Sequence, residues 1–279
     1  MRKRAVLLVA LLVAAAVSLG VCGCGSPSIP EGERSELILA TTTSVLDSGL
    51  LDALIERFEK SHPYRVKAVA VGSGAALLMA RQGEADVTIT HEPKAEVEFM
   101  QAGFGESRRE VMHNDFIIVG PSDDPAGIRG MADAAEAFTR ISRSGASFLS
   151  RGDASGTHAM ELSVWERAGI LPAGDWYRES GQGMGYTLRL AEEEGAYTLS
   201  DRATFVVLDE ALDLEVMVEG DPGLLNVYSV IVTNPALFPD ANVEGAREFA
   251  AFLFEKGTGD LIRDFGVDRY GRHLFYLCE

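Results

Sequence analysis

An alternation of strands and helices between residues 37 and 90 constrains the fold of this chain more than any other feature. The short apolar stretches ELILATTTS, YRVKAVAVGSG and ADVTIT are typical of strands, and the two segments between them are typical of helices. In the first helical segment Leu50, Leu54 and Phe58 recur at helical spacing. This β-α-β-α-β order predicts an open, parallel α/β sheet, whose ligands lie beyond the carboxyl ends of the strands.

The remainder of the chain continues the α/β pattern. The segments VMHNDFIIVGPSDDPAGI and NVYSVIVTN indicate two further buried strands, and VEGAREFAAFLFEKGTGDLIRDFG indicates two closing helices. No internal repeat is visible. About 245 residues follow the N-terminal segments, which is enough for one large domain or two medium lobes.

The N-terminus has the pattern of a secretory signal. A basic start is followed by a long apolar run and small residues, which predicts a signal peptide over residues 1–23. Cys24 has Gly23 directly before it and Val21 three positions before it, as in a bacterial lipobox, so we expect lipidation at Cys24. Cys22 fits that pattern less well, and an uncleaved membrane anchor is the alternative. Residues 24–36 read as a polar tether.

Charge and cysteine content narrow the class further. The chain has 25 basic and 42 acidic residues, a net charge of −17, which becomes −20 once the three basic residues of the signal are removed. Such acidity argues against nucleic acid or anionic lipid as a partner, but a small anion remains possible if donors are supplied locally. With Cys22 removed and Cys24 lipidated only Cys278 is left, so no internal disulfide can form.

Three turns from strand to helix share the same composition of hydroxyls and glycine. They are the run Thr41 to Ser44, the run Gly72 to Gly74, and the run Ser150 to Thr157. A helix start leaves backbone N–H groups unpaired and carries the positive end of the helix dipole. Any one hydroxyl of this kind can be a simple N-cap. Three at one edge of a sheet would supply donors only, which is what an oxyanion needs.

The third turn adds a formal charge. Arg151 comes directly after an apolar strand and offers a planar fork of donors to an oxyanion. Asp153 lies two residues on and is expected to hold the guanidinium from behind, unless the two form only a surface ion pair.

Other chemistries fit less well. Ser155 and His158 could act as nucleophile and base of a serine hydrolase, but their i,i+3 spacing at a helix start is poor for a triad. The run from Gly181 to Gly185 lacks the spacing of a dinucleotide-binding turn. The five histidines are scattered without metal-ligand spacing, so we expect no metal cation.

Several segments taken in order resemble the extracellular tungstate-binding component of bacterial ABC importers. They are TTTS, GSG, VMHNDFIIVGPSDDPAGI, SRGDASGTHAMELSVWERAG, GDWYRESGQGMGYTL and GAYTLSDRATF. The resemblance covers the chain from Leu37 to the last helices. It implies a type II periplasmic-binding fold, in which two α/β lobes are joined by a hinge and enclose the ligand in a cleft. The core Arg-x-Asp-x-Ser-Gly-Thr is shared more widely with phosphate-binding relatives.

The resemblance also implies boundaries and contacts. Lobe one would comprise residues 37–117 and 232–279, and lobe two residues 118–231. The implied ligand contacts are Thr42 or Thr43, Ser73, Arg151, Ser155 and Thr157. The resemblance further implies a solute-binding protein, not an enzyme, that delivers its ligand to a permease subunit. We expect a monomer without a cofactor, located in the periplasm or held to the membrane as a lipoprotein.

The choice of ligand within this family depends on the residue that follows the third strand. Phosphate relatives carry an aspartate after the third strand, which can accept a proton from hydrogen phosphate, and the aligned place here is near His91. Tungstate is fully deprotonated at neutral pH, so it binds hydrogen-bond donors and has no proton to give to an acceptor. A site without that aspartate therefore favours tungstate over phosphate. Molybdate is the nearest alternative, followed by sulfate and phosphate. We interpret His91 as structural. A ligand-sensing module that docks on a receptor is a further alternative.

Overall fold

The computed structural model describes residues 34–208 and 212–278. The expected signal peptide, Cys24 and the tether up to residue 33 lie outside these ranges. The strands are β1 (Ser35–Thr42), β2 (Tyr64–Val71), β3 (Val87–Thr90), β4 (Gly105–Pro121), β5 (Phe148–Ser150), β6 (Tyr177–Glu179), β7 (Thr198–Asp201), β8 (Leu214–Val218), β9 (Leu225–Thr233) and β10 (Tyr276–Leu277). The helices are α1 (Thr43–Asp47), α2 (Leu50–Ser61), α3 (Ser73–Arg81), α4 (Pro93–Gln101), α5 (Ala134–Ser144), α6 (Gly156–Arg167), α7 (Met184–Glu194), α8 (Arg202–Leu208), the short 3-10 helix η3 (Pro222–Leu224), α9 (Val243–Phe252), α10 (Lys256–Asp264) and α11 (Val267–Tyr270).

The first three strands form the parallel sheet that the alternation predicts. β1 lies between β2 and β3 and pairs with both in parallel. Beyond β3 the direction changes, because β9 runs antiparallel to both β3 and β4. The parallel arrangement thus holds for β1 to β3, the part of the chain for which the alternation predicts it, and the later strands join in the opposite direction. The local strand-helix-strand pattern says nothing of β9, which arrives from far along the chain.

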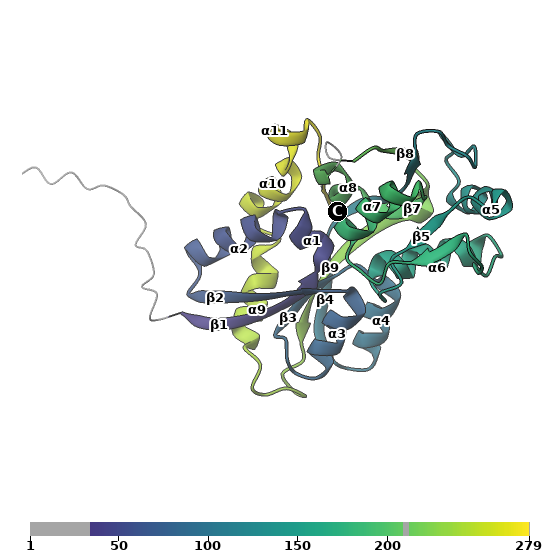
Figure 1. Cartoon of the computed structure of the whole chain (residues 1–279). Coiled ribbons are helices and arrows are strands. Elements are labelled where there is room, and N and C mark those ends of the chain that lie inside the picture. Colours follow the sequence, from purple (N-terminus) through teal and green to yellow (C-terminus); the bar gives the residue numbers. More distant parts are fainter. Residues whose placement is uncertain (1–33, 209–211, 279) are drawn as a thin grey trace, which may run out of the picture.

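The long strand β4 belongs to both lobes. From Gly105 to Asp115 it pairs with β9, and from Phe116 to Pro121 it pairs with β7 and β8. Figure 1 shows β4 near the centre, with α2, α9 and α10 on one side of the molecule and α5 and α6 at the far end of the other. We propose that this strand forms the first crossing between the lobes, for which the expected boundary is at residues 117 and 118.

The expected return crossing lies between residues 231 and 232, within β9. β9 pairs along its whole length with strands of lobe one, so residues 225–231 share a sheet with β3 and the first part of β4. We propose that the chain returns through residues 219–224, ahead of β9, rather than at residue 232. Arg202 lies at this place, where its guanidinium forms a bidentate ion pair with Asp115 on β4 (2.6 Å for both contacts) and a third contact with Glu219 at 2.8 Å.

Each lobe has apolar layers of its own. One cluster, with Leu39, Phe58 and Phe249, packs α2 and α9 on one face of the lobe-one sheet, and a smaller one around Ala76 and Phe99 packs α3 and α4. Two more clusters fill lobe two. Among the described residues no helix combines the length and apolar composition needed to span a bilayer.

Candidate functional site

Two of the three hydroxyl turns lie in lobe one, at the starts of α1 and α3. Thr42 and Ser73 are buried, with 2% and 0% of their surfaces exposed. Neither side chain caps its helix. The Thr42 hydroxyl lies 3.1 Å from that of Ser44, and Ser73 Oγ accepts the backbone N–H of His91 at 3.3 Å. Simple N-capping, the alternative explanation for these two hydroxyls, therefore does not account for them.

The third hydroxyl turn starts α6 in lobe two and does include a cap. Ser155 Oγ accepts the backbone N–H of His158 at 3.2 Å, as an N-cap does. Thr157, the second residue of the helix, is 1% exposed, and its hydroxyl lies 3.5 Å from Arg151 Nη1. Ser155 thus has a structural role in α6 whether or not it contacts a ligand.

Arg151 is almost fully enclosed by protein. It is 3% exposed, its Nη2 forms an ion pair with Asp153, and its Nε has no hydrogen-bond partner among the described residues. Asp153 also accepts the backbone N–H of Ser155 at 3.2 Å, so it connects the guanidinium to the start of α6. A buried guanidinium with an unused N–H retains donor capacity for an anion.

A buried carboxylate fixes the loop that carries Arg151. Glu161 of α6 accepts hydrogen bonds from Ser150 Oγ (2.6 Å), Tyr177 OH (2.8 Å) and Trp165 Nε1 (3.0 Å). The Ser150 hydroxyl in turn accepts the N–H of Gly152 at 3.2 Å, so the residues on both sides of Arg151 are held. Burial raises the pKa of Glu161 to about 7.

The two lobes touch each other at the candidate site. A Cβ added to Gly72, before α3, would lie 3.2 Å from Cα of Ser155. A Cβ added to Gly156 would lie only 2.6 Å from Cε1 of His91, which real contacts do not allow. Glycine at these two positions therefore permits the start of α6 to lie close to the start of α3 and to His91.

His91, which the sequence leads us to interpret as structural, lies at this contact. It is 5% exposed, and its ring packs near those of Tyr228 and Phe116, with centroid distances of 4.8 Å and 6.1 Å. Burial, followed by the positive charge of Arg151, lowers its pKa to about 4. The imidazole is thus neutral at neutral pH, and Arg151 is not accompanied by a second positive charge here.

Two buried groups of this region were not among the ligand contacts expected from the sequence. Ser44 lies between Thr42, His91 and Tyr228, at 3.1 Å, 3.4 Å and 3.4 Å from their polar atoms. Asp201 is completely buried, accepts the N–H of Thr204 at 2.9 Å, and leaves its Oδ2 without a partner among the described residues. Burial raises the pKa of Asp201. A signal existed for both, since Ser44 ends the first hydroxyl run and Asp201 ends an apolar strand before a helix.

The geometry around His158 does not resemble a catalytic pair. His158 Nδ1 accepts the backbone N–H of Ala154 at 3.2 Å, and Ser155 Oγ receives the backbone N–H of His158. Both side-chain atoms are thus bonded to the backbone rather than to each other. Ala154 itself has φ +55°, a left-handed conformation that side-chain-bearing residues seldom adopt, and it turns the chain into α6.

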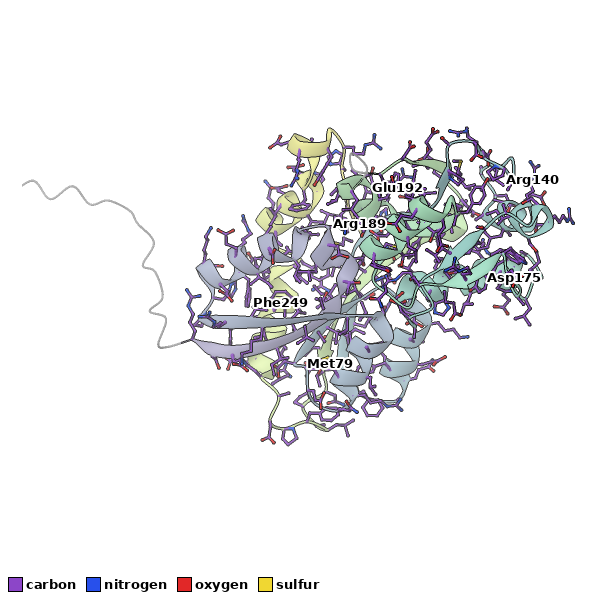
Figure 2. All side chains as sticks on the ribbon, in the orientation of Figure 1. Met79, Arg140, Asp175, Arg189, Glu192 and Phe249 are labelled. Atoms are coloured by element: carbon purple, nitrogen blue, oxygen red, sulfur yellow. The ribbon has the colours of Figure 1, made fainter. Side chains whose placement is uncertain are left out.

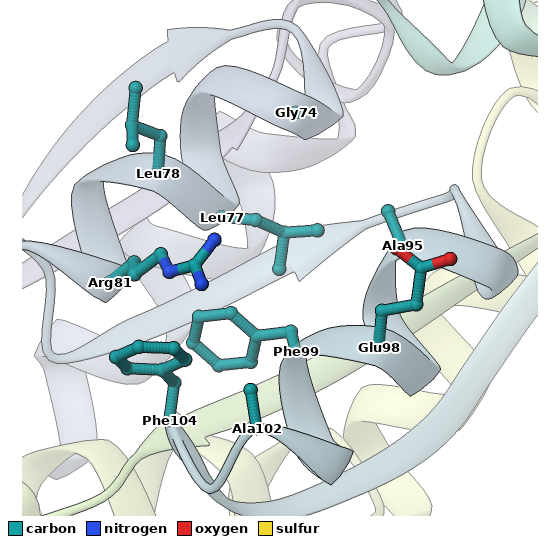
Figure 3. A pocket seen from close by; sticks show the side chains of 9 residues that line it. All are labelled: Gly74, Leu77, Leu78, Arg81, Ala95, Glu98, Phe99, Ala102 and Phe104. Atoms are coloured by element: carbon teal, nitrogen blue, oxygen red, sulfur yellow. The ribbon is translucent and has the colours of Figure 1, made fainter.

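A separate pocket of about 420 Å³ lies between α3 and α4 (Figure 3). Its walls include Leu77, Phe99 and Phe104, and Arg81 lies 4.6 Å from the centre of the Phe104 ring. It contains none of the predicted donors, so it is not the predicted site.

Known proteins resemble this chain over most of its length. The family described as the PBP superfamily domain matches residues 29–256. The tungstate-binding protein TupA of Peptoclostridium acidaminophilum is 43% identical over 267 residues, which are 93% of each chain. TupA of Campylobacter jejuni is 41% identical over 224 residues, 78% of this chain and 83% of that one. The crystal structure of the tungstate ABC transporter from Geobacter sulfurreducens is 43% identical, covers 83% of this chain and 99% of its own, and has a TM-score of 0.76.

Proposed function

Since this chain belongs to the PBP superfamily, we propose that it is an extracytoplasmic solute-binding protein that captures tungstate between its lobes and delivers it to the permease of an ABC transporter. The named relatives, two of them tungstate-binding proteins more than 40% identical to it, support this ligand.

The observation that carries the proposal is the set of buried donors that both lobes bring together. The proposed contacts from lobe one are the buried Thr42 and Ser73 and the half-buried Thr43, and those from lobe two are the buried Arg151, Ser155 and Thr157. Hydroxyls and a guanidinium can all donate to an oxyanion, and Arg151 supplies one formal charge against a dianion. Asp153 positions the guanidinium. The raised pKa of buried Asp201 favours a proton on that carboxyl, which then repels an anion less.

Ion size should set selectivity. Sulfate, molybdate and tungstate share charge and shape, so charge cannot separate them. Sulfate is smaller, and a rigid ring of donors placed for the larger ions leaves it under-bonded. We therefore propose the order tungstate, then molybdate, with sulfate and phosphate far behind. A molybdate-binding protein of the same fold is the alternative.

We propose that the protein has no enzymatic activity. The backbone bonds of Ser155 and His158 support this, because a nucleophile needs its base within hydrogen-bond reach. We further propose that the mature protein is a monomer held to the membrane by a lipid on Cys24, which lies outside the described residues.

Titration calorimetry with tungstate, molybdate, sulfate and phosphate tests the ligand. Tungstate should bind most tightly, and a series in which sulfate or phosphate equals it would refute the assignment. The same preparation should be incubated with generic ester substrates. Ligand-dependent thermal stabilisation without turnover is expected of a binding protein, whereas ester hydrolysis lost in Ser155→Ala would point to a hydrolase.

A further inference from the structure

Of the proposed ligand contacts, only Thr43 reaches solvent. Thr43 is half-buried. The others are exposed by 3% or less: Thr42, Ser73, Arg151, Ser155 and Thr157. Because Thr43 directly follows Thr42, the solvent that contacts Thr43 is one residue away from the buried donors.

Thr43 lines a pocket of about 380 Å³, here called the entrance pocket. Thr43 and Asp47 of α1 form its lobe-one wall, and residues of α7 and α8 form its lobe-two wall. On the lobe-two wall Thr204 is completely buried, and its hydroxyl has no partner among the described residues. Since the walls come from both lobes, any movement that separates the lobes widens this pocket.

Two opposite charges border the entrance pocket. Arg189 of α7 lines it and is exposed, and it forms no ion pair or hydrogen bond with any residue in 34–208 or 212–278. Asp47 faces it from lobe one. Burial raises the pKa of Asp47, and the charge of Arg151 opposes that rise, so Asp47 lies within electrostatic reach of the proposed site. Figure 2 shows Arg189 near the middle of the molecule, whereas Arg140 of α5 lies at its outer end.

We infer that the entrance pocket is the route by which a dianionic oxyanion reaches the buried donors, with Arg189 as the cation that attracts it and Asp47 as the carboxylate that slows it. This inference rests on the proposed function and adds a capture step to it.

The physical reason is the charge of the whole protein. At a net charge of −17 the molecule repels an approaching dianion, but charges beyond about 8 Å are largely screened at physiological salt. The nearest charges to the path then dominate the approach. Charges at the rim of a site act mainly on the association rate and its salt dependence, whereas buried contacts act on dissociation.

The test measures tungstate association by stopped-flow intrinsic fluorescence in wild type, Arg189→Gln, Asp47→Asn and the control Arg140→Gln. Each Arg→Gln change removes one positive charge, but only Arg189 borders the pocket. Rates are taken where they rise linearly with tungstate, at salt from about 0.01 M to about 1 M, over which the Debye length falls from about 30 Å to about 3 Å. Calorimetric Kd values then give the dissociation rates.

Arg189→Gln should lower the association rate about three- to tenfold at the lowest salt, and Asp47→Asn should raise it by a similar factor. Both effects should vanish at the highest salt and leave dissociation unchanged, and Arg140→Gln should match wild type. Equal association rates for Arg189→Gln and Arg140→Gln, or a loss confined to dissociation, would overturn the inference. If wild type itself does not bind tungstate, the proposed function fails instead.

Discussion

Acidification should act on two buried groups of the candidate site in opposite directions. His91 and Glu161 are both exposed by 5% or less, and both have pKa values displaced by burial. A group whose pKa differs between the folded and unfolded chain makes the free energy of unfolding depend on pH. The pKa shifts of His91 and Glu161 change the free energy of unfolding in opposite directions as the pH falls. In wild type the two changes should therefore partly cancel.

His91 should destabilise the protein as the pH falls. Its pKa is 6.5 in an unfolded chain and about 4 in the fold, because burial and the charge of Arg151 disfavour the imidazolium. Between those values the unfolded chain binds more protons, so this stabilising contribution is complete above pH 6.5 and is lost on the way to pH 4. At about 1.4 kcal/mol per pH unit the loss amounts to about 3 kcal/mol.

Glu161 should stabilise the protein as the pH falls. Its pKa rises from 4.5 to about 7, through burial and with a smaller contribution from the charge of Glu179. Here the folded chain binds more protons, so the contribution is complete below pH 4.5 and is lost as the pH rises through 7. It also amounts to about 3 kcal/mol. The raised pKa values of Asp47 and Asp201 act in the same direction as Glu161.

Denaturant unfolding at several pH values measures the contributions of both groups to the free energy of unfolding. It is carried out on wild type, His91→Asn, Glu161→Gln and the double variant. Relative to wild type, His91→Asn should gain stability as the pH falls from 6.5 to 4. Glu161→Gln should lose relative stability over the window from 7 to 4.5, and the double variant should track wild type more closely than either. A His91→Asn protein whose stability follows wild type at every pH would refute the reasoning for His91, and the same result for Glu161→Gln would refute it for Glu161.

Three further results are expected. Arg151→Ala should weaken tungstate binding by about 2–5 kcal/mol, roughly thirtyfold or more, with Arg151→Lys recovering only part of it; unchanged calorimetric affinity in Arg151→Ala would remove Arg151 from the site. Gly156→Ala places a Cβ 2.6 Å from the packed His91 ring. We expect tungstate to close the two lobes and so to lower the radius of gyration measured by small-angle scattering. Gly156→Ala should abolish this fall, whereas Gly74→Ala, whose Cβ would meet Ala154 O at an ordinary 3.5 Å, should keep it; equal compaction in both would show that this contact does not limit closure. Cys24→Ser should release the protein from membranes with binding intact, and a variant that stays uncleaved in the membrane fraction would indicate a transmembrane anchor instead.

Local features of the fold could be read from the sequence because they depend on neighbours along the chain. The helix around Leu54 and Phe58 is observed as α2, and the two-lobe α/β class is confirmed by the family match. The antiparallel insertion of β9 beside β3 could not be foreseen, because their pairing joins residues far apart in sequence and no local pattern specifies it.

For the candidate site, too, some features could be predicted from the sequence and others could not. Arg151 and the hydroxyl turns stand out as residue types at strand ends, and their part in binding stays a prediction. The neutral state of His91 could not be read from the sequence, since it depends on burial and on the nearness of Arg151. The unpartnered Oδ2 of Asp201 likewise exists only once α8 has packed over it.

The position of β9 has a consequence for how the chain folds. β3 and the part of β4 up to Asp115 both pair with residues 225–233, so neither ladder can form until nearly the whole chain has been synthesised. Pairings so distant in sequence are slow to form, because loop-closure entropy is lost before the contacts are gained. A fragment ending before β9 would leave open strand edges on β3 and β4, and open edges pair with other chains. Deletions that remove β9 should therefore cause aggregation through the first lobe, although strands β1 to β4 are still present in the chain.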